Sequence, residues 1–345
     1  MSQTQTDVSQ DSPAESEEQY QAFVRALKRR RGFGLLFVRC SPAQGERLIA
    51  RVRKDIPQKR IDILPLEDKI DNLYEIIESL PNKDQLDILF ITGIEKSLVD
   101  YIKPGIGGQG DYYKEDTIPR ILGHLNLQRE RFRDSFNICF VFLLPKYALK
   151  YFIRRAPDFF DWRSGVLEFA TSPELVQQES SRLVLEGDYE KYLELSIQER
   201  NRKIFEIQEL LEEDHQTLEQ KAKLLLEQGH LFLVGNECEE AIACYDQVIK
   251  IQPSQYVAWY SRGNALFDLE QYQEAIASYD EAIKIQPDQD GVWYNRGIAL
   301  VQLGHYEEAI ASYDRALAIK PDKYQAWNSR GIALKQLGRY AEAIA

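Results

Sequence analysis

Two kinds of hydrophobic pattern divide the chain near its middle. In the first half, short apolar runs alternate with longer segments in which apolar residues recur at helical spacing. Such runs predict buried parallel strands, and the longer segments predict helices of about 10–15 residues. The predicted strands span residues 34–40, 61–64, 86–91 and 137–144, and the predicted helices span 20–31, 46–54, 68–80, 118–132 and 146–155. This order predicts a three-layer α/β domain with a parallel sheet.

The second half of the chain repeats itself every 34 residues, as Trp259, Trp293 and Trp327 show. Other residues keep the same register: Gly263, Gly297, Gly331, Leu266, Leu300, Leu334, Ala275, Ala309, Ala343, Tyr279, Tyr313, Ala282, Ala316, Pro287 and Pro321. This is the pattern of the tetratricopeptide repeat, a helix pair that stacks on its neighbours into an all-α solenoid. The Trp, Tyr and Ala positions are expected in the core of the solenoid. Four copies start near residues 222, 256, 290 and 324. The first is degenerate, with Leu225 at the Trp position, and the last is incomplete.

Function in such an array is expected on the concave surface, which the first helix of each repeat lines at repeat positions 2, 5, 9 and 12. The predicted partner-binding residues of this groove are Leu226, His230, Tyr260, Asn264, Phe267, Tyr294, Ile298, Val301 and Asn328. Tyrosine supplies a large rigid contact area with a polar tip, which favours an extended or helical peptide of a protein partner. Repeats that clamp a terminal carboxylate carry Lys and Asn at positions 5 and 9, and position 5 here has no Lys. The alternative is a groove filled by a neighbouring segment of the same chain.

The turn after the first predicted strand is where an α/β domain of this kind would bind a phosphate. The P-loop pattern GxxxxGK[ST] places Lys on the phosphates and a hydroxyl on Mg²⁺. On residues 40–47 the pattern finds Gly45 at the second Gly, but Cys40, Glu46 and Arg47 at the other three defining positions. A carboxylate at the Lys position repels a polyphosphate, so ATP hydrolysis is not expected.

Residues 90–96 resemble the acidic strand motif hhhhDGhDE of the STAND and NACHT class of P-loop signalling ATPases. Gly93 and Ile94 are in place, Glu95 stands where the second acid belongs, and Thr92 replaces the metal-associated Asp. Residues 20–170 resemble, by topology, a bacterial family of such domains joined to tetratricopeptide repeats. The resemblance implies a P-loop NTPase-like domain without hydrolysis, with nucleotide-site remnants at Gly45, Glu46, Arg47, Thr92 and Glu95. The alternative is a working switch that uses ATP and Mg²⁺, with the repeats as its sensor.

The composition excludes several classes of function. The net charge of −12 over 345 residues repels nucleic acid and anionic membranes. No apolar run approaches the ~20 residues that span a bilayer, and the polar N-terminus is not a signal peptide. The four cysteines form no CxxC pair and the four histidines have no partner at metal spacing. These features predict a cytoplasmic protein with reduced thiols, without a metal or another cofactor, and not an enzyme.

Two segments of the first half suggest weaker alternatives. Basic residues are frequent at 25–31 and at 51–60, where they either form one face that binds nucleic acid or nucleotide locally or are ordinary solvated helix positions. The glycine-rich segment 104–110 follows a predicted helix. A dinucleotide-binding loop would follow a strand, so a surface loop is favoured here.

The predicted organisation has four parts: a disordered acidic tail at 1–18, the α/β domain at 19–170, a helical connector at 171–221 and the repeats at 222–345. The fourth repeat has no capping helix, which predicts a fragment of a longer array whose last repeat frays or self-associates. The expected function is an interaction scaffold or sensor. Its repeats bind a protein or peptide partner, and its ATPase-like domain organises the assembly.

Overall fold

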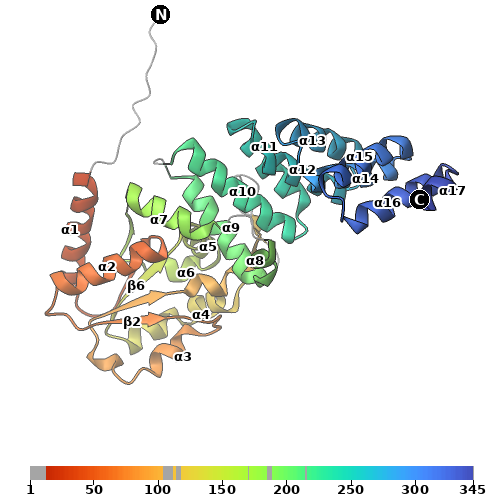
Figure 1. Cartoon of the computed structure of the whole chain (residues 1–345). Coiled ribbons are helices and arrows are strands. Elements are labelled where there is room, and N and C mark those ends of the chain that lie inside the picture. The colour runs from red at the N-terminus through yellow and green to blue at the C-terminus, as the bar shows by residue number, and fades with distance from the viewer. Residues whose placement is uncertain are drawn as a thin grey trace, which may run out of the picture. The chain divides into compact units, whose positions relative to one another are not determined.

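The computed structural model describes residues 13–103, 112–113, 118–169, 171–184, 189–213 and 216–344 (Figure 1). The predicted loop at 104–110 and residues 1–12 of the predicted tail lie outside them. The strands are β1 (Gly34–Arg39), β2 (Ile61–Pro65), β3 (Ile88–Thr92), β4 (Ile102–Lys103), β5 (Tyr112–Tyr113), β6 (Cys139–Leu144) and β7 (Gly165–Glu168). The helices of the first half are α1 (Pro13–Arg29), α2 (Pro42–Asp55), α3 (Leu73–Glu78), α4 (Arg120–Ser135), α5 (Lys146–Arg155), α6 (Pro157–Phe160), α7 (Pro173–Leu183), α8 (Tyr189–Glu194) and α9 (Ile197–Leu211).

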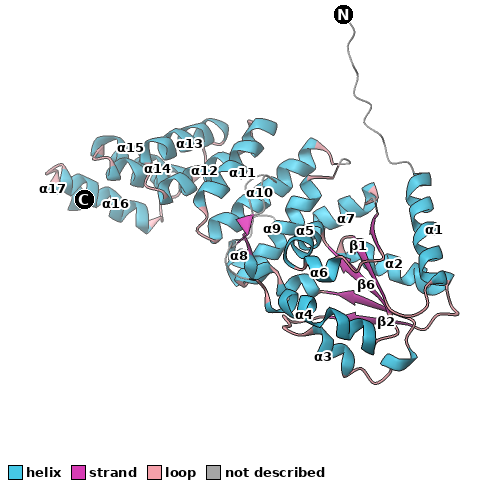
Figure 2. Ribbon diagram, turned by 180° about the vertical axis from the view of Figure 1, so that it is seen from behind, coloured by secondary structure: helices cyan, strands magenta, loops and turns pink. Residues whose placement is uncertain are grey.

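Only helices follow from residue 216 onward, as Figure 2 shows in cyan. They are α10 (Leu218–Val234), α11 (Cys238–Ile251), α12 (Tyr256–Asp268), α13 (Tyr272–Ile285), α14 (Asp290–Gln302), α15 (Tyr306–Ile319), α16 (Tyr324–Gln336) and α17 (Tyr340–Ile344). The chain forms two compact units, an α/β unit and the helical repeats.

The α/β unit is built on a five-stranded parallel sheet with the strand order β2-β3-β6-β1-β7. The four predicted strands are confirmed, and β7 at the edge was not predicted. Helices α1 and α2 cover one face of the sheet, and α3, α4, α5, α6 and α9 contribute to the core on the other face (Figure 2). The predicted three-layer α/β arrangement is therefore present.

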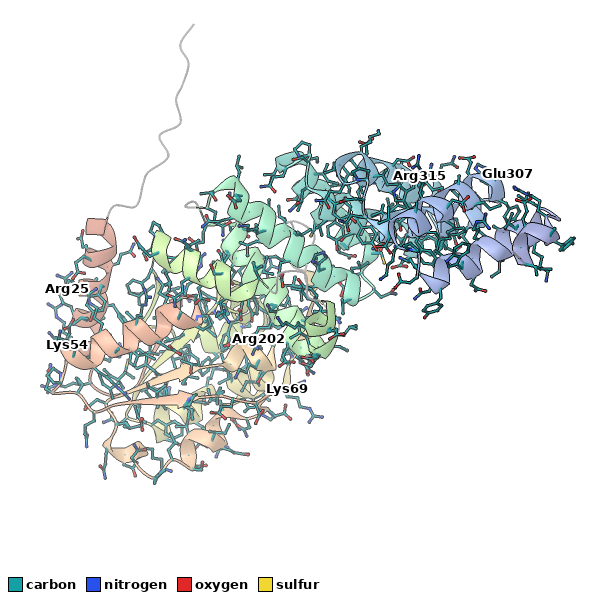
Figure 3. The ribbon with its side chains drawn as sticks, in the orientation of Figure 1. Arg25, Lys54, Lys69, Arg202, Glu307 and Arg315 are labelled. Atoms are coloured by element: carbon teal, nitrogen blue, oxygen red, sulfur yellow. The ribbon has the colours of Figure 1, made fainter. Side chains whose placement is uncertain are left out.

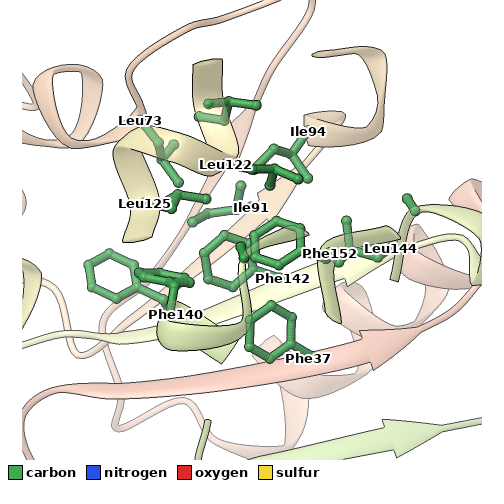
Figure 4. Close-up of a cluster of buried hydrophobic side chains, with 14 of the residues drawn as sticks. Phe37, Leu73, Ile91, Ile94, Leu122, Leu125, Phe140, Phe142, Leu144 and Phe152 are labelled. Carbon is green, nitrogen blue, oxygen red and sulfur yellow. The ribbon is translucent and has the colours of Figure 1, made fainter. Parts of the chain in front are cut away.

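Alternate residues of each strand point to opposite faces, because side chains in a strand alternate. On β1, Leu35 and Phe37 belong to one core cluster, whereas Leu36 and Val38 belong to the other. Figure 4 shows the first cluster, in which Phe37 stacks on Phe142 of β6 at 5.0 Å. Apolar residues on both faces explain why these strands appear in the sequence as unbroken apolar runs.

Each complete repeat is a pair of antiparallel helices in which a glycine and a tyrosine lie face to face. A Cβ atom on Gly229, Gly263 or Gly297 would lie 2.5 Å from the ring of Tyr245, Tyr279 or Tyr313, respectively. Only glycine allows this approach. The three tyrosines are almost fully buried and form the aromatic core of the solenoid. The tryptophans were predicted as core too, but Trp259 and Trp293 are partly exposed and Trp327 is 52% exposed.

The boundaries between the predicted parts differ from the observed ones. Helix α1 begins at Pro13, within the predicted tail. The predicted connector at 171–221 is divided, because residues 171–181 and 201–213 belong to the α/β unit and residues 189–200 belong to the repeats. The first repeat helix starts at Leu218, where Thr217 and Gln220 form a capping box.

Candidate functional site

The concave positions of the two middle repeats are held together by a hydrogen-bonded network. The Asn295 amide nitrogen donates to the Tyr260 hydroxyl at 3.1 Å and to Asn264 Oδ1 at 3.0 Å. Asn264 Oδ1 also accepts a bond from the Tyr279 hydroxyl at 2.9 Å. The network spans α12, α13 and α14, so it fixes Tyr260 and Asn264 across a junction between repeats.

Asn295 was missed in the sequence analysis, which considered repeat positions 2, 5, 9 and 12. Asn295 occupies position 6, and the other repeats hold Glu227, Ser261 and Ser329 there. This position is polar in all four copies, and that is the signal that could have revealed it. The role also recurs, since Ser261 lies 3.3 Å from His230 Nε2 at position 9 of the preceding repeat.

All the predicted groove residues of the middle repeats are partly exposed, as a binding surface requires. They are Tyr260, Asn264, Phe267, Tyr294, Ile298 and Val301. Tyr256 stacks on Tyr260 with ring centres 6.0 Å apart and enlarges the aromatic surface. Lys323 lies over the Tyr294 ring at 4.8 Å and donates to Asp290 at 2.7 Å, so the charge of this lysine is already paired within the chain.

The first repeat differs, because another helix of the chain covers its concave side. The Tyr192 hydroxyl of α8 donates to Glu227 at 2.7 Å and lies 3.4 Å from His230 Nδ1. Burial lowers the pKa of His230 to about 4, so this imidazole is neutral at physiological pH. His230 therefore contacts the chain itself. A contact of this kind is what the alternative of an internally filled groove predicts, and the neighbouring predicted residue Leu226 is partly exposed.

The last repeat presents its concave position to solvent. Asn328 is exposed, and so are several apolar side chains of α16 and α17. They are Tyr324, Trp327, Ile332, Tyr340 and Ile344. Self-association through this repeat stays a prediction.

The connection between β1 and α2, which is followed by the predicted nucleotide-site remnants Gly45, Glu46 and Arg47, does not form a phosphate loop. Only Cys40 and Ser41 connect the strand to the helix. Ser41 caps the helix by accepting a bond from Gln44 N at 3.2 Å, and Gly45 N donates to the Ser41 carbonyl at 2.9 Å. Gly45 is therefore a helical residue that packs on Leu143 of β6, and Glu46 and Arg47 are exposed on α2. No run of backbone N–H groups is left there to surround a phosphate.

Thr92 and Glu95 lie at the carboxyl end of β3, where a parallel sheet usually binds its ligand. Gly93 between them adopts φ +84°, which favours glycine, and a Cβ there would clash with the Leu66 carbonyl. Burial raises the pKa of Glu95 above its usual range, and Glu95 Oε2 has no hydrogen-bond partner among the described residues. Thr92 is the last residue of β3, and Glu95 lies in the turn that follows, next to Ile94 of the core on one face of the sheet. Gly45 is on α2, which covers the other face of the sheet.

Helix α9 occupies the carboxyl edge of the sheet. Its Glu209 accepts a bond from Tyr147 N, the start of α5, at 2.8 Å, and its Phe205 stacks on the Tyr147 ring at 4.5 Å. Burial raises the pKa of Glu209 to about 7. Carboxylates also come from Glu206, Glu212 and Glu213, against the cations Arg39, Lys146 and Arg202. This edge is closed and rich in acids, an unfavourable surface for a polyphosphate.

The described part of the chain offers few residues for membrane insertion, metal binding or thiol chemistry. None of its helices is long and apolar enough to cross a membrane. No group of three or more His, Cys, Asp or Glu residues there could hold a metal ion. The four cysteines are free and buried, and burial with nearby Glu209 and Glu95 raises the pKa of Cys40 to about 12.

Comparison with known families supports the periodic pattern of the second half. A TPR repeat model matches residues 229–270 and 263–304, and a tetratricopeptide repeat model matches residues 294–345. Residues 229–345 are tetratricopeptide repeats. The P-loop and STAND resemblance of the first half has no such support. Tetratricopeptide repeats in this half imply a role in protein–protein interaction.

Several solved structures are similar to part of this chain. MamA is 24% identical over 42% of this chain and 83% of its own, with a TM-score of 0.40. The first TPR of Spaghetti (RPAP3), bound to the HSP90 peptide SRMEEVD, is 28% identical over 34% of this chain and 94% of its own, with a TM-score of 0.34. The Arabidopsis OM64 TPR domain is 23% identical over 34% of this chain and 98% of its own, with a TM-score of 0.34. No curated protein matches the chain.

Proposed function

We propose that the chain is an interaction scaffold whose middle repeats bind an extended or helical peptide of a protein partner. The observation that carries this proposal is the orientation of Asn264. Its Oδ1 atom accepts hydrogen bonds from both Asn295 and Tyr279. Its Nδ2 atom has no hydrogen-bond partner in the part of the chain that the structure describes. A fixed donor at mid-groove is suited to a peptide carbonyl.

The side chains around Asn264 define the kind of peptide. Tyr256 and Tyr260 on one side, with Tyr294 and Ile298 on the other, supply apolar contact area. Lys323, which lies over the Tyr294 ring, is paired with Asp290. The groove therefore favours a segment with aromatic or aliphatic anchors over an acidic carboxyl terminus, and the HSP90 peptide remains a property of the neighbour that binds it.

The test is selection of peptides on the full chain from a displayed random library, followed by titration of the enriched peptide. Asn264→Ala and Tyr260→Ala should each weaken its binding by at least tenfold, or about 1.4 kcal/mol. Tyr340→Ala is the matched control, because Tyr340 is an exposed tyrosine outside the groove. Binding that all three variants leave unchanged, with circular dichroism showing intact helices, would contradict the proposal.

For the α/β domain we propose an organising role without ATP hydrolysis. Support comes from the short β1–α2 connection and from α9, which occupies the carboxyl edge of the sheet. Mg²⁺-ATP should then bind weakly or not at all in calorimetry. A low-micromolar affinity, about −8 kcal/mol, would instead favour the ATP-dependent switch, above all if Glu95→Gln abolished it.

A further inference from the structure

A cavity of about 370 Å³ lies at the amino edge of the same sheet, opposite the edge that α9 closes. The strands β1, β2, β3 and β6 begin level with one another there, because Gly34 is in register with Cys139, and Ile88 with both Cys139 and Ile61. The segments that lead into these strands therefore come together. All four contribute to the wall: residues 30–32, 59–60, 83–84 with 86–87, and 135–138.

The wall of this cavity is basic although the protein as a whole is acidic. Five lining residues are Lys or Arg and two are Asp. They are Arg30, Arg31, Lys59, Arg60, Lys83, Asp84 and Asp87. The sequence shows part of this set, at 25–31 and 51–60, but Lys83 is distant along the chain, so only the fold brings the set together.

Part of this charge is already used within the fold. Asp87 accepts a bond from Arg60 N at 2.9 Å, and it lies 3.5 Å from Arg60 Nε and 3.8 Å from Lys59 Nζ. These contacts lower the pKa of Asp87. Arg30 donates to the Phe33 carbonyl at 2.9 Å, and Lys83 donates to the Glu78 carbonyl at 2.6 Å. These are neutral acceptors.

The unused positive charge is what makes the cavity a site. The charges of Arg30 and Lys83 are not neutralised by these bonds, because both acceptors are carbonyl groups. Arg31 has no carboxylate within 4 Å among the described residues. The excess over the two Asp side chains matches a ligand with two or more negative charges.

We propose that this cavity, the amino-edge pocket, binds a small molecule that carries one or two phosphate groups. The guanidinium group of Arg31 offers paired donors of the geometry that phosphate oxygens accept, and Arg60, which is paired with Asp87 through Nε, adds positive charge beside it. The volume is in the range of small-ligand sites. The apolar wall residues Leu86, Phe136 and Ile138 are nearly fully buried, so they offer the ligand little surface and recognition rests on charge.

The experiment is calorimetric titration of the full chain with inorganic pyrophosphate, and with orthophosphate as the less charged probe. The pocket variant is Arg31→Gln with Arg60→Gln, both exposed residues whose loss should not affect folding. The control variant is Arg25→Gln with Lys54→Gln, two exposed residues of α1 and α2 outside the pocket that are labelled in Figure 3. Each variant removes two positive charges, so the overall field changes equally.

Pyrophosphate should bind more tightly than orthophosphate. The pocket variant should weaken pyrophosphate binding at least tenfold, and the control less than threefold. Asp84→Asn removes an acid from the wall and should tighten binding about threefold, a gain that misfolding could not produce. Equal losses in both double variants, or no binding at 1 mM pyrophosphate, would overturn the proposal. So would a single-stranded RNA that binds the pocket when pyrophosphate does not.

Discussion

Two glycines that sequence motifs single out behave differently in the two halves of the chain. In the repeats, Gly263 has the role its motif implies, since its missing side chain makes room for the ring of Tyr279. In the α/β domain, Gly45 fits the second Gly of a phosphate loop, yet it lies inside α2 and packs on Leu143. A glycine that recurs three times in one register therefore predicts a packing contact correctly. A glycine that matches one position of a largely absent motif does not predict the local structure.

The largest expected effect separates these glycines directly. Gly263→Ala should lower the free energy of unfolding by about 3 kcal/mol, at the upper end for overpacking, because its Cβ would lie 2.5 Å from a buried ring. Gly45→Ala should change it by less than about 1 kcal/mol, since its Cβ would meet the end of a Leu side chain at 3.1 Å. Helix propensity improves equally in both variants and cancels.

Hydrogen exchange of full-length protein, followed by mass spectrometry, measures each half separately, which is needed because a two-unit chain need not unfold in one step. Exchange should accelerate across α12 and α13 in Gly263→Ala. If Gly45→Ala destabilises α2 by as much, the distinction between the two motifs is lost.

The same contrast explains what could be predicted from the sequence. Strands with apolar residues on both faces, such as β1 and β6, are buried whichever way they face, so their positions follow from composition alone. The short edge strand β7 has partly buried and exposed residues in turn and only four residues, too few for a clear pattern. Groove residues followed from the 34-residue period, with Asn295 missed because its position was not among those considered.

Contacts between distant segments could not be predicted. Nothing near Glu209 in the sequence indicates that it would accept a bond from Tyr147 N, 62 residues away. Likewise, nothing near Tyr192 indicates that it would reach His230, 38 residues away. Both contacts come from the segment predicted as a connector, whose apolar residues revealed a buried helix face but not the surface that buries it.

The second prediction concerns the closed edge of the sheet, which has no counterpart in the repeats. The pKa of Glu209, about 7, exceeds the usual value of 4.5, so the folded state binds its proton more tightly than the unfolded state. The stability that this proton provides is full below pH 4.5 and is lost as the pH rises through 7. Glu209→Gln should therefore stabilise the α/β unit by on the order of 2 kcal/mol at pH 8 and hardly at all at pH 4.5.

Hydrogen exchange of the α/β unit in both proteins at several pH values, corrected for the intrinsic exchange rate at each pH, would measure this effect. The Tyr147 backbone N–H and the side chains of Arg39, Glu206 and Glu212 face Glu209, and the substitution leaves these groups in place. Glu46→Gln is the control, because Glu46 is exposed on α2 and reports only the general effect of one charge fewer. Equal pH profiles for the two variants would show that Glu209 titrates normally.

A third prediction compares two tryptophans at the same repeat position. Trp293 packs against Ala316, Leu317 and Ala326, whereas Trp327 is 52% exposed. Both donate their indole N–H to a proline carbonyl at 2.9 Å, so the hydrogen bond cancels in the comparison. Trp293→Ala should cost about 1–2 kcal/mol more than Trp327→Ala, because it removes more buried apolar area. Chemical unfolding followed by circular dichroism measures both, and equal losses would mean that Trp327 is covered in solution.

The smallest expected effect tests a polar contact that recurs on the repeats. Arg262, Arg296 and Arg330 each donate to an aspartate of the preceding repeat at 2.6–2.7 Å. Arg296 also donates to Ser312 of its own repeat at 2.7 Å, so it ties α14 to both flanking helices. Because the Asp280 side chain is 43% exposed, the Arg296–Asp280 pair should contribute only about 0.5–1 kcal/mol. A double-mutant cycle with Arg296→Ala and Asp280→Ala isolates that coupling, and 0.5 M salt should reduce it. A coupling above 2 kcal/mol, insensitive to salt, would mean that these exposed pairs, rather than the glycine–tyrosine packing, set the stability of the repeats.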